Sequence, residues 1–465
     1  MLQSVTDTLV GILLLLLVLL EVLAQWSGDP IFFHAAAMAV LPLVVLLAAR
    51  TQWARRMFLL VGLGLVVLAF FIRREDWLEI TQAALTSSAF IGAFFTAMST
   101  LRNASGSSGA IERCGRFLAQ QPPGRRYLAL TVGGHLFGLL LSYGSLVLLG
   151  SLAESNARQE PNAEIRRHRL RRMLLAIQRG FISTLSWSPL AFAIAISTKL
   201  VPGASWTTAL LPCLGTSAIL ILTGWALDSI FKPRLSRPPP PRTPTSDSWL
   251  TLWPLLALLL FLVIAVGSLH FITAVAIIGV VMLVVPLLSL TWIFCQNIKG
   301  APFLTLLRRA AAFLSVELPN YRGEVVILLM AGFIGTAGSR LLLPYVAASG
   351  IDLTALPSWQ VLLGIVWLIP LTGQFGMNPI LAVSLFAPLL PEASAMGLTP
   401  ADIILAITAG WSLSGASSPY TATTLLVGAL GRVSARHVGL RWNAAYTLIC
   451  GSALSIWVVI VSQLL

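Results

Sequence analysis

Apolar residues run along the chain in long blocks that recur from one end to the other. A helix needs about 20 mostly apolar residues to cross the hydrocarbon core of a bilayer. The first block follows Asp7 and has no basic leader segment, so we interpret it as a retained span rather than a signal peptide. The blocks predict spans at residues 9–26, 31–49, 57–72, 83–101, 180–198, 207–229, 250–268, 271–294, 324–345, 401–430 and 442–464. The pattern therefore predicts an all-α polytopic membrane protein.

Two weaker apolar stretches, residues 128–153 and 358–391, interrupt this series. Basic residues mark the cytoplasmic ends of membrane spans. Nearly all of them fall on one side if the N-terminus is cytoplasmic and each weak stretch returns to the side that it left. One full crossing in either stretch would move every later loop to the opposite side. The charges therefore predict two re-entrant hairpins, although two true crossings in each stretch fit them equally well.

Two of the spans carry a polar interruption that contains a Ser-Pro pair. Glycine and proline loosen a helix, and hydroxyl groups can serve the backbone groups that this frees. Such backbone is tolerated at membrane depth only where protein or a watery cavity covers it. The residues at the first break are Ser186, Ser188 and Pro189, and those at the second are Ser414, Gly415, Ser417, Ser418 and Thr421. Both spans are therefore predicted to be broken helices that face a site.

The turns of the two hairpins are the other candidate parts of this site. Helix ends at a turn expose N–H groups and a partial positive charge, which suit an anion, and the carbonyls at opposite helix ends can hold Na⁺. The predicted turn residues are Ser142, Gly144 and Ser145 in the first hairpin and Gly376, Asn378 and Pro379 in the second. The candidate Na⁺ ligands are Ser142, Ser145, Asn378 and Ser414. Alternatively, these small residues only pack membrane helices together. Because hairpin and break occur in the same order in both halves, we favour a substrate site.

The same order of features divides the chain into five segments. Residues 1–82 are N-terminal scaffold helices, and residues 83–229 form a first repeat with hairpin 128–153 and broken helix 180–198. Residues 230–249 are a proline-rich cytoplasmic linker, and residues 250–323 provide scaffold helices and a cytoplasmic loop. Residues 324–465 form a second repeat with hairpin 358–391 and broken helix 401–430. The first hairpin enters from the cytoplasm and the second from outside, so the repeats are inverted. The charged stretch 153–178 is expected to be a loop.

A hairpin followed by a Ser/Gly/Pro-broken helix, twice and in inverted orientation, resembles the ion transporter superfamily. That family includes the divalent anion/sodium symporters and the large membrane subunits of TRAP carriers. The resemblance covers residues 80–230 and 320–465. Gly376-Met377-Asn378-Pro379 is similar to the Ser-Asn-Thr motif of the family's hairpin tips, while the first tip has no asparagine. The resemblance implies an elevator-type carrier, coupled to Na⁺ or H⁺, whose scaffold forms a homodimer.

Composition and charge narrow the class of protein. Apolar residues make up 57% of the chain and charged residues 10%, which excludes an ordinary soluble protein. The net charge of +13 does not indicate nucleic-acid binding, because the basic residues lie in loops between spans. The cysteines Cys114, Cys213, Cys295 and Cys450 have no metal-like or redox spacing, so no cofactor is expected beyond a coupling ion. No GxxxxGK[ST] motif is present, so the chain shows no ATPase of its own.

Few ionisable groups fall inside the predicted spans. Arg340 and Arg102 hold matching places in the two halves, where they either pair with an anionic substrate or extend to water at the interface. His135, on the first hairpin, either couples protons or is hydrogen-bonded within a helix pair. No acidic residue lies in a break or a hairpin tip, which favours an anionic substrate over a cation.

These observations predict a secondary active transporter of a small anion, a carboxylate or an oxyanion, in a bacterial inner membrane with its N-terminus in the cytoplasm. Its expected partners are the lipid bilayer, the anion and a second copy of the chain. One alternative is a membrane-embedded enzyme that acts on a lipid-linked substrate, although the predicted external loops carry acidic residues without a catalytic motif. The other alternative is a non-transporting accessory subunit of a membrane complex.

Overall fold

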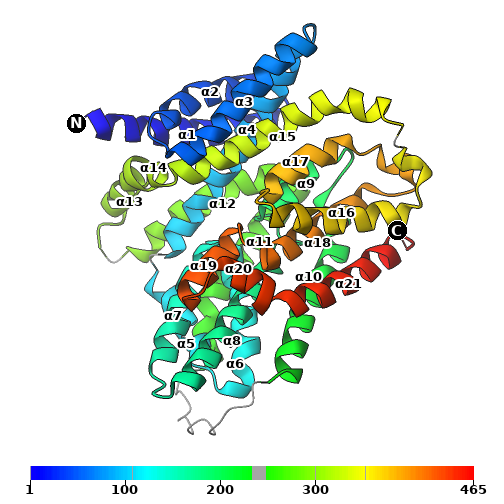
Figure 1. The fold of residues 1–465 in the computed structure, drawn as a ribbon. Helices are drawn as coiled ribbons and strands as arrows, with labels where there is room; N and C mark the ends of the chain where they lie inside the picture. Colours follow the sequence, from blue (N-terminus) through cyan, green and yellow to red (C-terminus); the bar gives the residue numbers. More distant parts are fainter. Residues whose placement is uncertain (1, 107, 233–247, 299, 351, 465) are drawn as a thin grey trace. The chain divides into compact units, whose positions relative to one another are not determined.

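The computed structural model describes residues 2–106, 108–232, 248–298, 300–350 and 352–464 as an assembly of helices (Figure 1). Within these residues, nine helices are long and apolar enough to cross a membrane. They are α1 (Leu2–Ser27), α2 (Pro30–Ala48), α3 (Trp53–Ile72), α4 (Trp77–Gly106), α10 (Trp206–Ile230), α11 (Trp253–Thr273), α12 (Ile277–Gln296), α15 (Arg322–Ala348) and α21 (Ala444–Val461). The predicted all-α polytopic membrane fold is therefore confirmed.

Large apolar side chains cover the outside of several of these helices. Val45, Leu63 and Phe71 are each exposed by more than half of their surface. Exposing such side chains to water is unfavourable, whereas exposing them to the hydrocarbon of a bilayer has no such cost. A helix that is apolar all round and only partly covered by protein is expected to face lipid.

The chain forms two compact units, and each takes segments from both halves of the sequence. The first unit comprises residues 1–105, 262–353 and 380–391. In it, α1 packs against α2 and α12, and α15 packs against α3 and α2. A short connection consists of α13 (Pro302–Ala312), the π-helical turn η2 (Phe313–Glu317) and α14 (Leu318–Asn320). Helix α13 packs on α12, whereas η2 and α14 pack on α1. This unit is thus a bundle of long, continuous apolar helices.

The second unit comprises residues 106–261, 354–379 and 392–465. Its sequence-first part contains α5 (Gly109–Ala119), α6 (Pro123–Leu141), α7 (Gly144–Arg158), α8 (Ala163–Ile182) and α9 (Phe192–Leu200), followed by α10. Its later part contains α16 (Ser358–Gln374), α18 (Pro400–Ser417), α19 (Ala422–Gly431), α20 (Ala435–His437), the π-helical turn η6 (Val438–Trp442) and α21. Helix α6 packs on α8, and α16 packs on α18 (Figure 1).

Short helical pieces complete the described chain. Helix α17 (Pro379–Phe386) follows the turn after α16, and its residues from 380 onward belong to the first unit. The 3₁₀ turns are η1 (Trp249–Leu252), η3 (Leu353–Ala355), η4 (Ala387–Leu389) and η5 (Ala393–Met396). Most of the proline-rich linker, residues 233–247, lies outside the described residues.

The charged stretch 153–178, expected to be a loop, is helical, so that prediction was wrong. Helix α7 continues to Arg158, and α8 begins at Ala163. The side chain of Asn162 caps α8, because its Oδ1 accepts hydrogen bonds from the N–H groups of Glu164 (2.9 Å) and Ile165 (3.2 Å). Such a cap stabilises a helix start by about 1 kcal/mol. Residues 302–312, within the expected loop of segment 250–323, form the helix α13 for a related reason: Pro302 occupies its first turn.

Candidate functional site

The first hairpin turn is a tight connection of two residues between α6 and α7. Ser142 has φ 48° and ψ −131°, a conformation that a non-glycine residue adopts only under constraint. Its N–H donates to the Gly138 carbonyl at 3.0 Å, and its own carbonyl accepts from the Ser145 hydroxyl at 2.7 Å. Gly144 is the first residue of α7. The predicted tip serines therefore hold the turn together.

The first broken helix is interrupted between α8 and α9, over residues 183–191. Pro189 has no N–H to continue a helix, and the two serine hydroxyls that precede it are bonded to backbone groups. The Ser186 hydroxyl donates to the Ser183 carbonyl at 3.0 Å, and the Ser188 hydroxyl accepts from the Leu190 N–H at 3.2 Å. Ser186 and Ser188 are buried. This break is thus a covered and internally bonded stretch of backbone.

The second broken helix is interrupted between α18 and α19, where Pro419 again lacks an N–H. The carbonyl of Gly415 consequently loses its helical donor. The Gln178 amide (3.3 Å) and the Thr423 hydroxyl donate to it instead. The neighbouring Ala416 carbonyl accepts from the Asn443 amide at 3.2 Å. Side chains from three other elements therefore replace the backbone donors that the break removes.

Hydroxyl groups complete the second break. The Ser418 carbonyl accepts from the hydroxyls of Thr424 (2.6 Å) and Thr421 (3.0 Å). The Ser417 hydroxyl donates back to the Leu413 carbonyl at 2.9 Å. With these bonds, the start of α19 is fixed against the end of α18.

Helix α16, the first arm of the second hairpin, ends in contact with the second break. The Ser418 hydroxyl donates to the Gly373 carbonyl at 2.6 Å, and a methyl group at Gly373 would come within 2.7 Å of the Ser414 hydroxyl oxygen. Gly376, with φ 89°, lies in the turn and faces the Tyr420 ring. Asn378 and Pro379 follow, and Pro379 opens α17. The structure thus brings Ser414 and Ser418 together with this hairpin.

Each hairpin arm packs on the broken helix that follows it, and the two pairs make equivalent contacts. A methyl group at Gly180 of α8 would lie 2.0 Å from the Thr131 carbonyl oxygen of α6, and one at Gly410 of α18 would lie 2.6 Å from the Val366 carbonyl oxygen of α16. Gly138 and Gly373 lie seven residues after Thr131 and Val366 on the two hairpin arms. A methyl group at Gly138 would lie 3.2 Å from the Thr184 side chain, and one at Gly373 would lie 2.7 Å from the Ser414 hydroxyl. In each pair the contacts advance in the same direction along both helices, so the hairpin arm and the broken helix run parallel.

The two breaks also contact each other. A methyl group at Gly415 would lie 3.1 Å from the Ile182 side chain and 3.5 Å from that of Leu185, at the end of α8. The first hairpin tip reaches the same place, since the rings of Tyr143 and Phe181 lie 5.1 Å apart. All predicted site residues belong to the second unit.

Two polar atoms beside the second break have no hydrogen-bond partner within the described chain. They are the hydroxyl oxygen of Ser414 and the side-chain oxygen of Gln374, both buried. A serine hydroxyl can donate to a carboxylate, and both oxygens can accept or coordinate a cation. The Ser414 hydroxyl therefore fits an anion, whereas the two oxygens together fit Na⁺. Of the other proposed Na⁺ ligands, Ser142 and Ser145 lie at the first hairpin tip, where the Ser145 hydroxyl donates to the Ser142 carbonyl. Asn378 lies in the turn of the second hairpin.

Sequence reasoning missed the side chains that support the second break. Gln178 and Asn443 are bonded to each other at 3.0 Å as well as to the α18 carbonyls. Arg179, assigned only to membrane orientation, is buried: it donates to Asn443 (3.2 Å) and Tyr127 (3.0 Å) and stacks on the Tyr446 ring. The only sequence signal was a glutamine and an arginine directly before a predicted broken helix.

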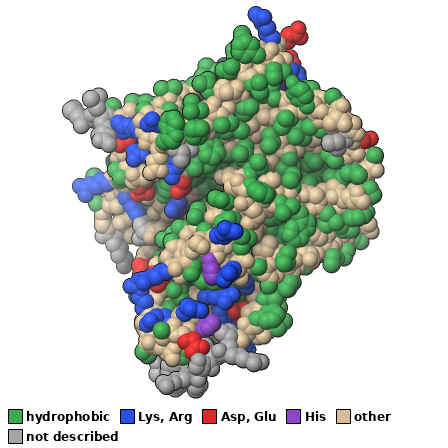
Figure 2. Space-filling model, in the orientation of Figure 1, with side chains coloured by type: hydrophobic (Ala, Val, Ile, Leu, Met, Phe, Trp, Pro, Cys, Tyr) green, Lys and Arg blue, Asp and Glu red, His purple; other side chains and the backbone are tan. Residues whose placement is uncertain are grey.

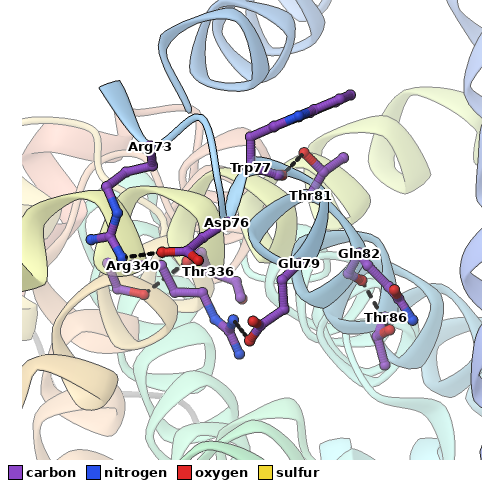
Figure 3. A network of polar contacts seen from close by, with 10 residues as sticks. Arg73, Asp76, Trp77, Glu79, Thr81, Gln82, Thr86, Thr336 and Arg340 are labelled. Carbon is purple, nitrogen blue, oxygen red and sulfur yellow. Dashed lines mark hydrogen bonds and ion pairs between the residues drawn. The ribbon is translucent and has the colours of Figure 1, made fainter. Parts of the chain in front are cut away.

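The other ionisable candidates have partners inside the protein. Arg340 forms an exposed ion pair with Glu79 at 2.8 Å, and Figure 3 shows the two side chains pointing toward one another. Arg102 lies over the Tyr321 ring. The Nδ1 atom of His135 lies 2.7 Å from the Ser183 hydroxyl, and this bond joins α6 to α8.

Comparison with known proteins identifies the fold. No protein-family model and no curated protein matches the chain. It is similar to the solved structure of the YdaH transporter of Alcanivorax borkumensis, with a TM-score of 0.53 and 15% identity over 88% of this chain and 99% of that one. It is also similar to MtrF of Neisseria gonorrhoeae, described with a class of antimetabolite efflux pumps, with a TM-score of 0.53 and 12% identity over 88% and 94%. The chain therefore has the fold of membrane transporters. Membership of the ion transporter superfamily stays a prediction.

Proposed function

We propose that the protein is a secondary active transporter of a small anion, a carboxylate or an oxyanion, in a bacterial inner membrane. Na⁺ or H⁺ is the proposed coupling ion, and the N-terminus is proposed to be cytoplasmic. The shared fold with YdaH and MtrF supports transport as the general function. Because MtrF is described as an efflux pump, flux should be measured in both directions.

The paired arrangement of hairpins and broken helices is the observation that carries this proposal. Two hairpin arms each pack on a broken helix through glycines at corresponding positions, and the two breaks contact each other. Transporters with internal repeats bind substrate where interrupted helices meet. Neither the turns (142–145 and 373–379) nor the breaks (183–191 and 414–424) contain Asp or Glu, so an anion would meet no like charge from them.

Division of the chain into two units supports an elevator-type mechanism. Every proposed binding residue lies in the second unit, while the first unit is a bundle of long continuous helices. In an elevator carrier, the unit that holds the substrate moves as a body against a scaffold. We assign these roles to the second and first units, with a homodimer formed through the scaffold.

Thermal unfolding of the purified protein tests substrate binding. Ligands that bind the folded state raise its apparent stability by mass action. We expect one class among small carboxylates, sulfonates and inorganic oxyanions to raise the melting temperature, with a dependence on Na⁺ or pH that identifies the coupling ion. A shift with lipid-linked sugars and with none of the anions would instead favour an enzyme.

Flux in proteoliposomes then tests the site itself. In Ser414→Ala the lost hydroxyl has no partner within the described chain, so folding should be preserved. A hydrogen bond to a charged group contributes about 1.5–3 kcal/mol, so flux at limiting anion concentration should fall roughly 10- to 150-fold. Ser268→Ala is the matched control, because that exposed hydroxyl bonds only to carbonyls of its own helix. Equal flux in both variants would place the substrate elsewhere.

A further inference from the structure

A basic patch lies on the second unit beside the second broken helix. It consists of Arg167 and Arg171 on α8, Arg436 and His437 on α20, and Arg441 and Trp442 on η6. Figure 2 shows Lys, Arg and His side chains gathered on the visible face. Here we call these six residues the basic patch.

The arginines of this patch are not neutralised by carboxylates. None of the ion pairs formed by the described residues involves Arg167, Arg171, Arg436 or Arg441. Nearby Arg432 and Arg158, in contrast, both pair with Glu154. The patch therefore carries an excess of positive charge that an external anion would balance.

Arg171 shows that this charge is crowded. Its side chain is half-buried, and burial, together with the positive charges of Arg179 and Arg167, lowers the pKa of its guanidinium. The group still stays charged at neutral pH. Charged residues that only set membrane orientation need not be packed against protein in this way.

Trp442 gives the patch an apolar base. Its ring lies under the Arg171 guanidinium, 5.7 Å away, and meets the His437 ring edge-on. Below, it packs on a cluster formed by Leu174, Val427 and Val438. Tryptophan is enriched where one side of a protein is apolar and the other is wet, as at the membrane surface.

The position of the patch along the chain places it at headgroup depth. Arg441 and Trp442 lie directly before α21, one of the helices that can span the membrane, which begins at Ala444. Basic clusters beside a membrane helix attract anionic lipid, and basic pockets between such helices bind phosphate headgroups. We propose that the basic patch is a binding site for the phosphate headgroup of an anionic phospholipid.

This site adjoins the second break. A methyl group at Gly439 of η6 would lie 2.0 Å from the Ser417 carbonyl oxygen, and Asn443, next to Trp442, bonds to the Ala416 carbonyl. A bound headgroup would therefore steady the segment that supports α18. The lipid site does not depend on the proposed substrate, since it rests only on the membrane fold and the charges.

Lipid titration of the purified full-length protein tests the proposal. The melting temperature is measured against added phosphatidylglycerol, which carries one negative charge, and against phosphatidylcholine, which is neutral overall. Phosphatidylglycerol should raise the melting temperature at lower concentration. The quadruple variant Arg167→Gln/Arg171→Gln/Arg436→Gln/Arg441→Gln should need at least about tenfold more of it, since one basic residue near the surface contributes about fivefold.

A matched variant removes the same charge elsewhere on the predicted cytoplasmic side: Arg113→Gln/Arg125→Gln/Arg308→Gln/Arg322→Gln, all exposed. It should keep the wild-type lipid preference within about twofold. Should the patch variant fail to fold, the single variants Arg436→Gln and Arg441→Gln, both exposed, should each weaken the response about fivefold. An undiminished response in the patch variants, or an equal loss in the matched variant, would overturn the site. An equal shift with inorganic phosphate alone would overturn the lipid as its occupant.

Discussion

At the scale of single residues, one methyl group is enough to test the contact between each hairpin and its broken helix. In Gly180→Ala the added carbon would meet the Thr131 carbonyl at 2.0 Å, and in Gly410→Ala it would meet the Val366 carbonyl at 2.6 Å. Backbone on both sides leaves little room to adjust, and overpacking of this kind costs about 1–3 kcal/mol. Both variants should therefore melt at lower temperature in detergent. Gly64→Ala is the control, since nothing lies within 4 Å of the added carbon; an equal loss there would contradict the argument.

Asn443 allows a second test at this scale. Asn443→Ala removes the donor to the Ala416 carbonyl and the bonds to Gln178 and Arg179, and a buried polar group left without a partner costs about 1–3 kcal/mol. Thermal unfolding should show a clear loss of stability. Asn297→Ala should show little, because that amide bonds only to a carbonyl of its own helix. A smaller effect at Asn443 than at Asn297 would show that the network does not support the break.

At the scale of elements, the breaks themselves can be repaired. Pro419→Ala restores an N–H where α18 now ends, and proline inside a helix costs about 3 kcal/mol. Protein stability should stay level or rise, while anion flux in proteoliposomes should fall at least about tenfold because the site loses its irregular backbone. Pro286→Ala, inside the continuous helix α12, should leave flux unchanged. Wild-type flux in Pro419→Ala would show that the break is not part of the transport site.

The elements also show what the sequence can reveal. A Ser-Pro pair acts locally, so it marks a helix break without any knowledge of its neighbours. Helix α18 ends directly before its pair, at Ser417, and α8 ends six residues before its pair, at Ile182. The donors that repair the break are distant in sequence: Gln178 reaches Gly415, and the pattern of apolar residues contains nothing about that pairing. The charged helix start at Ala163 was missed because apolar periodicity was the main guide, while the cap at Asn162 determines it. Ligand-facing roles for the hairpin and break residues stay predictions.

At the scale of the whole molecule, a native cysteine can test the proposed orientation. Cys295 is exposed near the end of α12, at the predicted cytoplasmic side, whereas the other three cysteines are buried. Burial also raises the pKa of the Cys114 thiol, and the thiolate is the reactive form. A membrane-impermeant maleimide should therefore label the protein only in permeabilised cells, and Cys295→Ser should abolish labelling. Labelling of Cys295 in intact cells would show that the proposed orientation, with a cytoplasmic N-terminus, is wrong.

The pairing of each hairpin with the broken helix that follows it has a consequence for biosynthesis. Thr131, Gly138 and Gly180 are all made before the second half of the chain, so the first half-site can assemble on the ribosome, while its contact with Gly415 must wait. The side chains of His135 and Ser183 are hydrogen-bonded to each other. If both are replaced by cysteine, a disulfide between them should form in nascent chains stalled at Ile230. If it forms only in the full-length chain, the halves fold together instead. In stepwise assembly, the first hairpin and its broken helix would already be folded while the second hairpin and its broken helix are still being translated.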